Sequence, residues 1–138
     1  MKKRLTEKEF GKIIYEEFVR LPEKFRSRIN NVAMLVEDEP SDEVRALEGL
    51  TDDETLLGYY HGIPNTVRGE GYGIGPTFPD TITLFRLPIL DEAEESGLSV
   101  RHVVRETLEH EIAHYFGMSE DEVGKREESR RKLRRFSL

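Results

Sequence analysis

Apolar residues repeat at helical spacing in the first part of the chain. They recur every three or four positions between residues 7 and 21, and Thr6 with Glu9 matches a capping box. Pro22 follows at once, as is typical just past a helix end. The pattern predicts an amphipathic helix over residues 7–21.

Three short segments have the pattern of strands. Residues 31–37 (NVAMLVE) and 56–60 (LLGYY) are apolar and β-leaning, and residues 81–86 (TITLFR) alternate in the clearest strand pattern of the chain. A short helix is expected over residues 41–47, with a serine as its cap. The glycine- and proline-rich stretch over residues 62–79 predicts a long loop.

The C-terminal part of the chain predicts further helices. Pro88 is expected to stop the preceding strand, and Ser99 can cap a helix with a buried stripe over residues 100–115. Gly117 then suits the left-handed position that ends a helix. A second capping box opens a predicted last helix over residues 119–135.

Length and composition indicate one domain. The 138 residues are 36% hydrophobic and 36% charged, which fits one modest core in a single domain over residues 1–138. No apolar run approaches the roughly 20 residues that cross a bilayer, and the start lacks the apolar region of a secretory signal. There is no cysteine, so disulfides and thiolate ligands are excluded, and a cytoplasmic location is expected.

Charge is unevenly distributed along the chain. The net charge is −7, yet the stretch from Val123 onward holds seven basic and two acidic residues in a predicted basic helical tail. The acidic body argues against nucleic acid as a partner, and only the basic tail favours one. The sequence leaves the oligomeric state open.

The chemistry is concentrated in eleven residues that read His110-Glu111-x-x-His114-x-x-Gly117-x-x-Glu120. Histidines four apart on a helix lie on one face, so both imidazoles can bind one ion, and Zn²⁺ is the ion that this pattern indicates. Glycine allows the chain to turn back, so that Glu120 can serve as the third ligand.

Glu111 projects from the same helix about 100° from the first histidine, which suits a base better than a ligand. The pattern predicts that it takes a proton from zinc-activated water, which attacks a peptide bond or a similar amide, and passes the proton to the leaving amine. Asp121 and Glu122 leave the third ligand open. His61 and His102 have no place in the motif. Structural roles are expected for both, although His61, at the mouth of the glycine-rich loop, could touch substrate.

With these residues identified, the chain resembles the minimal zincin-like metallopeptidases of bacteria. The resemblance lies in residues 110–123 (HEIAHYFGMSEDEV), 56–69 (LLGYYHGIPNTVRG) and 72–86 (YGIGPTFPDTITLFR). It implies an α+β fold in which a small mixed or antiparallel sheet packs on the active-site helix, with N- and C-terminal helices. It also implies zinc bound by the two histidines, with a glutamate as the base. The family usually has aspartate where Glu120 stands, which leaves the third ligand open.

Substrate contacts are expected on the strand and loop before this helix. Zincins bind a peptide along an exposed edge strand, and TITLFR is the candidate, with Thr81 and Thr83 as contacts. Tyr72 could donate a hydrogen bond to the oxyanion, and Arg68 could bind a substrate carboxylate.

Three functions are compatible with these features. A zinc-dependent peptidase acting on a peptide or protein substrate accounts for the complete motif. A non-catalytic, zinc-stabilised peptide-binding module is the alternative, because no large second subdomain forms a deep cleft. A metal-dependent ribonuclease is disfavoured, because such enzymes lack a glutamate after the first histidine of their motif.

Overall fold

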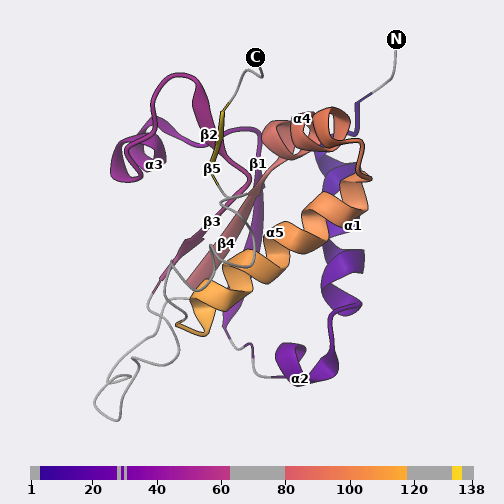
Figure 1. The fold of residues 1–138 in the computed structure, drawn as a ribbon. Coiled ribbons are helices and arrows are strands. Elements are labelled where there is room, and N and C mark those ends of the chain that lie inside the picture. The colour runs from indigo at the N-terminus through magenta and orange to yellow at the C-terminus, as the bar shows by residue number, and fades with distance from the viewer. Residues whose placement is uncertain (1–3, 28, 30, 63–79, 118–131, 135–138) are drawn as a thin grey trace, which may run out of the picture.

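The computed structural model describes residues 4–27, 29, 31–62, 80–117 and 132–134. The chain forms five helices and five strands within this part (Figure 1). The helices are α1 (Glu7–Val19), α2 (Glu23–Arg26), α3 (Asp42–Leu47), α4 (Arg86–Ser96) and α5 (Val100–Tyr115). The strands are β1 (Val32–Glu37), β2 (Glu54–Leu56), β3 (Gly58–His61), β4 (Asp80–Phe85) and β5 (Lys132–Arg134).

A mixed three-stranded sheet forms the centre of the fold, in the order β1-β4-β3. The first pair is parallel, with Met34 opposite Ile82, and the second is antiparallel, with Tyr60 opposite the same isoleucine. A separate antiparallel pair joins β2 to β5, far apart in sequence. Together with the helices, this confirms the expected α+β fold.

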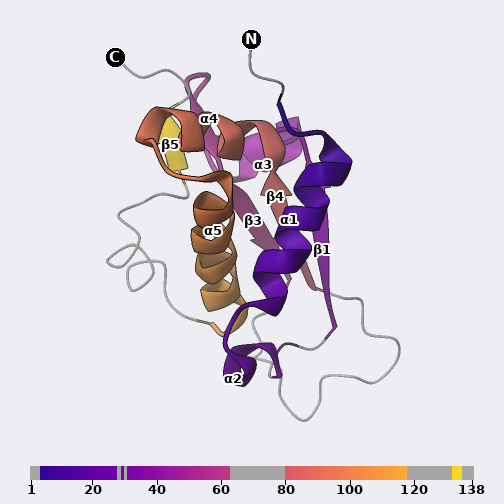
Figure 2. The same ribbon diagram turned by 90° about the vertical axis from the view of Figure 1, so that its right-hand side faces the viewer.

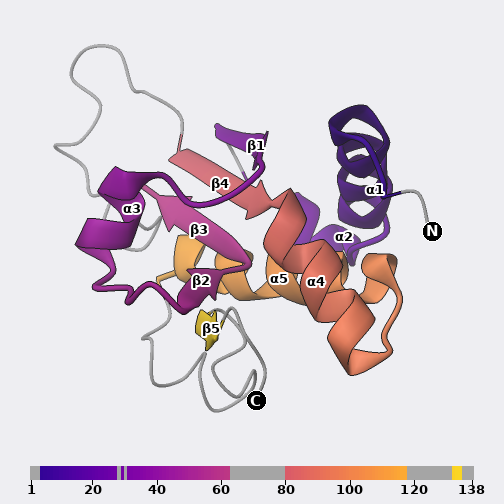
Figure 3. The ribbon, with the colours of Figure 1, turned by 90° about the horizontal axis from the view of Figure 1, so that it is seen from above.

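The helices α1, α4 and α5 lie against one face of the sheet, as Figures 2 and 3 show. In these views α5 crosses the strands with α1 beside it, while α3 lies beyond β3. The core between these layers contains buried side chains from α1, β4, α4 and α5, among them the fully buried Phe10, Ile82, Leu84, Val104 and Leu108. The apolar face of the sheet therefore fixes where α5 lies.

Local signals in the sequence account for where the helices start. The side chain of Thr6 accepts a hydrogen bond from the backbone of Glu9, whose own side chain bonds back, as the capping box predicts. The side chains of Ser41 and Ser99 each accept one backbone hydrogen bond at the starts of α3 and α5, without the reciprocal bond of a capping box. Each cap satisfies a backbone N–H that has no partner within its helix.

Two helices of the structure were not predicted from the sequence. Pro88 was expected to end the preceding strand, but α4 already begins at Arg86, directly after β4. Proline is tolerated there because it occupies the first turn, where its missing N–H would have no helical partner. The single turn of α2 also went unpredicted, since it has no apolar stripe of its own.

The strand at residues 81–86 is not an exposed edge, so that prediction is wrong. β4 is the central strand, hydrogen-bonded to β1 on one side and β3 on the other. The two outer strands take its place as the edges of this sheet.

The predicted C-terminal helix does not extend to Arg135, because residues 132–134 form β5 against β2. The start of that helix, at residues 118–131, lies outside the described residues, as do residues 63–79 of the predicted loop. No helix in the described part of the chain combines the length and apolar character needed to cross a membrane.

Candidate metal centre

The C-terminal half of α5 carries the histidines of the motif. This helix begins at the Ser99 cap and is held against the sheet by a buried stripe that includes Val104 and Leu108. It ends at Tyr115, and Gly117 follows with a φ of +81°, the left-handed conformation that the sequence predicted. The chain therefore turns directly after the second histidine.

His110 and His114 lie one helical turn apart, with ring centroids separated by 5.1 Å. Two imidazoles that bind one tetrahedral ion at about 2.0–2.1 Å have ring centres about 5 Å apart, so the pair fits a shared Zn²⁺. His110 is only 4% exposed, while His114 is half-buried. The donor chemistry and spacing of these two side chains fit the metal that the motif implies.

Glu111 is the most deeply buried of the motif residues that the structure describes, at 1% exposure. Its Oε2 lies 3.9 Å from Nε2 of His110. The side chain packs beneath β3, where its Cγ lies 3.2 Å from the position that a β-carbon on Gly58 would occupy. The structure therefore places a carboxylate beside the first histidine of the motif, at the interface of helix and sheet.

The candidates for the third ligand lie outside the described residues, since Glu120 and its neighbours Asp121 and Glu122 all follow residue 117. Among the residues that the structure does describe, no group of three or more metal-binding side chains comes together. The structure thus places the two candidate histidine ligands, and the identity of the third stays a prediction.

A family profile for zincin-like metallopeptidases matches residues 29–130, most of the chain. The chain belongs to the zincin-like metallopeptidase family. Among solved structures, a conserved hypothetical protein from Thermus thermophilus is similar over 88% of this chain and 99% of its own, at 24% identity and a TM-score of 0.51. That similarity supports the fold alone. No curated protein matches the chain.

The predicted substrate contacts of this zincin-like chain are only partly placed. Tyr72 and Arg68 lie outside the described residues. Thr81 is half-buried and Thr83 is buried, and both lie on β4. Because this strand is central, binding by strand addition to it has no structural basis, and a contact from either threonine stays a prediction.

A tyrosine–aspartate pair near the site was missed by sequence reasoning. The hydroxyl of Tyr60 donates a hydrogen bond of 2.7 Å to Oδ2 of Asp80, which is buried, and the two residues come from β3 and β4. The ring of Tyr60 meets that of Tyr115 edge-on at 6.3 Å, next to the histidines of α5. Strand alternation alone does not indicate this pairing, because it depends on the register between two strands.

The remaining histidines each have a ring or an acid as neighbour, and their expected structural roles stay predictions. His61 stacks on Tyr59, with ring centroids 6.4 Å apart. His102 lies 3.0 Å from Glu106 one turn further along α5, and half of its side chain is exposed. Neither of them was expected to bind the metal.

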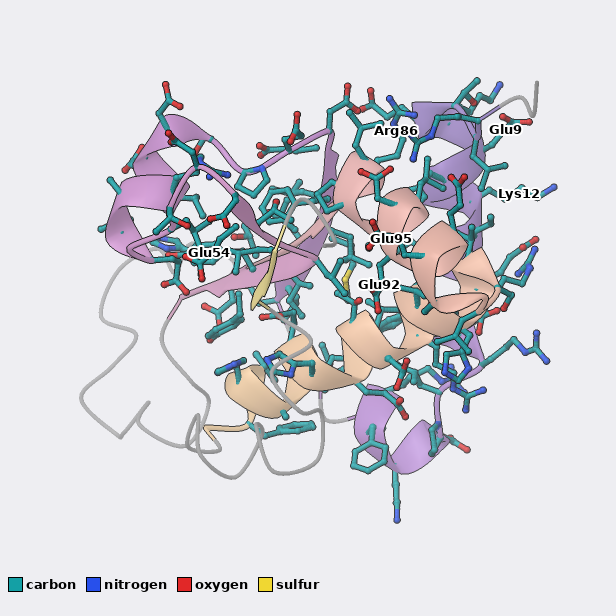
Figure 4. All side chains as sticks on the ribbon, turned by 45° about the horizontal axis from the view of Figure 1, so that its top comes forward. Glu9, Lys12, Glu54, Arg86, Glu92 and Glu95 are labelled. Atoms are coloured by element: carbon teal, nitrogen blue, oxygen red, sulfur yellow. The ribbon has the colours of Figure 1, made fainter. Side chains whose placement is uncertain are left out.

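The structure also has a cavity far from the histidines of the motif. A cavity of about 460 Å³ lies at the opposite end of α5, lined by residues that include Leu5, Leu90, Leu98 and Val100. Figure 4 shows Glu92 and Glu95 on α4 and Lys12 on α1, remote from the C-terminal turn of α5. This cavity is therefore separate from the candidate metal centre.

Proposed function

We propose that this zincin-like protein is a zinc-dependent peptidase. The observation that carries the proposal is the position of Glu111, a buried carboxylate 3.9 Å from the imidazole of His110 on the same helix. A buried acid beside a metal-binding histidine has the chemistry of a general base, whereas a purely structural zinc site has no need of one.

The residues have distinct roles in this proposal. His110 and His114 hold the metal, with Glu120 as the proposed third ligand. When bound, zinc acidifies water and polarises the carbonyl oxygen of the substrate. Glu111 accepts a proton from the attacking water and delivers it to the leaving amine nitrogen. The carboxylate can hold that proton between the two steps because its surroundings exclude bulk solvent.

The sheet limits where a peptide substrate could pair. Among the strands that the structure describes β4 is central, so a substrate strand would add to this sheet at β1 or β3. β3 packs against α5, whereas β1 packs against α1, so β3 is the edge beside the metal-binding helix. In this proposal the substrate strand therefore adds to β3 and not, as first predicted, to β4.

The deciding experiment compares the parent protein with Glu111→Gln. Metal content is measured by elemental analysis, and turnover by mass spectrometry of a mixed peptide library. Glu109→Gln is the matched control, because this glutamate lies two positions earlier on α5 and is exposed. We expect one zinc per chain in all three proteins, with cleavage by the parent and the control only.

Two other results would contradict the proposal. Cleavage that persists in Glu111→Gln would exclude this glutamate as the base. Zinc in every protein with no cleavage by the parent would favour the zinc-stabilised peptide-binding module.

A further inference from the structure

Gly58 lies on β3 where this strand packs against α5, close to Glu111. A β-carbon at this position would lie 2.7 Å from Cγ2 of Thr107 and 3.2 Å from Cγ of Glu111. It would also lie 3.2 Å from the backbone oxygen of Thr83 on β4. We propose that Gly58 is a positioning residue for Glu111, an inference that rests on the proposed peptidase function.

The glycine is needed for space and not for its backbone conformation. Gly62, Gly97 and Gly117 have positive φ, whereas Gly58 does not, so an L-residue could adopt its backbone without strain. A glycine inside a strand often marks a site where another part of the chain comes close. Here that part is α5, at the level of its buried glutamate.

The neighbours of Gly58 cannot easily move aside. The Thr107 hydroxyl donates a 2.8 Å hydrogen bond to the backbone oxygen of Val103, and the side chain is buried. Because threonine is β-branched, turning its methyl away would also break this bond. The carbonyl of Thr83 belongs to the central strand and is fixed by the sheet. An added methyl group must therefore push β3 away from α5, and it would also press on Cγ of Glu111, which would have to give by a few tenths of an ångström.

Such a displacement should affect the chemical step more than binding. A shift of about 1 Å in a catalytic group can lower a rate about 100-fold. The imidazoles of His110 and His114 are not among the atoms nearest to the added carbon. We therefore expect Gly58→Ala to lower kcat at least about tenfold, with KM within about twofold and the zinc content unchanged.

Removal of the nearest obstacle should restore the rate. Thr107→Ser deletes the methyl group at 2.7 Å and keeps the hydroxyl that bonds Val103. We expect Gly58→Ala/Thr107→Ser to regain most of the lost kcat, while Thr107→Ser alone stays near the parent. Gly11→Ala is the control, because a β-carbon at Gly11 meets nothing within 4 Å.

The experiment measures kcat, KM, zinc content and the thermal unfolding midpoint for these proteins. Unchanged kcat in Gly58→Ala, or loss of zinc together with activity, would overturn the positioning role. A double variant Gly58→Ala/Thr107→Ser that regains thermal stability but not kcat would also overturn the positioning role.

The proposed peptidase function fails if the parent protein itself cleaves no peptide. The positioning role would then fall with it, but the unfolding midpoints would still show whether the contact between residues 58 and 107 exists. A parent that cleaves peptides beside a fully active Gly58→Ala would overturn the positioning role alone.

Discussion

Replacing Tyr60 with phenylalanine removes one hydroxyl group and leaves the ring in place. That hydroxyl donates to the carboxylate of Asp80, which is 2% exposed, over 2.7 Å. The bond joins β3 to β4 at residues that flank the segment 63–79. The edge-on contact with Tyr115 depends only on the ring, so the substitution tests the hydrogen bond and not the packing.

The magnitude follows from burial and charge. A hydrogen bond to a charged group contributes about 1.5–3 kcal/mol, and a buried acceptor that loses its donor is costly. Asp80 keeps other interactions, so the lower end, about 1.5 kcal/mol, is expected. For a domain of this size that loss lowers the unfolding midpoint by about 5 °C.

Urea and thermal unfolding measure this loss. Tyr15→Phe is the matched control, because Tyr15 lies on α1 and is 69% exposed, so its hydroxyl is expected to contribute little. A double-mutant cycle with Asp80→Asn then isolates the coupling between the two side chains. If Tyr60→Phe unfolds at the same midpoint as Tyr15→Phe, the reasoning from the buried hydrogen bond is refuted.

Two further predictions concern α5. Gly117→Ala should lower the free energy of unfolding by about 1 kcal/mol, because residue 117 has a φ of +81°. Chemical denaturation measures this free energy, and an unchanged value would contradict the prediction. The hydrogen bond from Arg101 lowers the pKa of Glu16 below its ordinary 4.5. This pair therefore stabilises the fold above pH 4.5, and the stabilisation is lost as the pH falls through the lowered pKa. Arg101→Met should therefore flatten the acid side of a plot of stability against pH. It should also lower the unfolding midpoint at pH 7 more than Arg4→Met, because Arg101 also pairs with the buried Glu17, whereas the partner of Arg4 is exposed. Equal midpoints for the two variants would contradict this assignment.

Features that depend on neighbours in sequence were predictable. The caps at Thr6, Ser41 and Ser99 involve residues three apart, so the sequence alone placed the starts of three helices. The histidine pair was predictable for the same reason, because four residues make about one helical turn. Gly117 was also predicted correctly, as the left-handed residue that ends α5.

Features that depend on pairing between distant segments were not predictable. The alternation in residues 81–86 gave the strand and its buried face, but it contains no information on how many neighbours the strand has. The prediction of an edge strand failed for that reason. Likewise, nothing in residues 132–134 signals their pairing with β2.

The sequence by itself therefore determined the helix that carries the motif, with its two histidines and the glutamate between them, because four residues make about one helical turn. Only the tertiary structure decided that this glutamate is buried beneath β3 and that Gly58 leaves room for it. Those contacts join residues that lie far apart in the sequence. They arise because the apolar stripe of α5 and the apolar face of the sheet exclude water from the same interface.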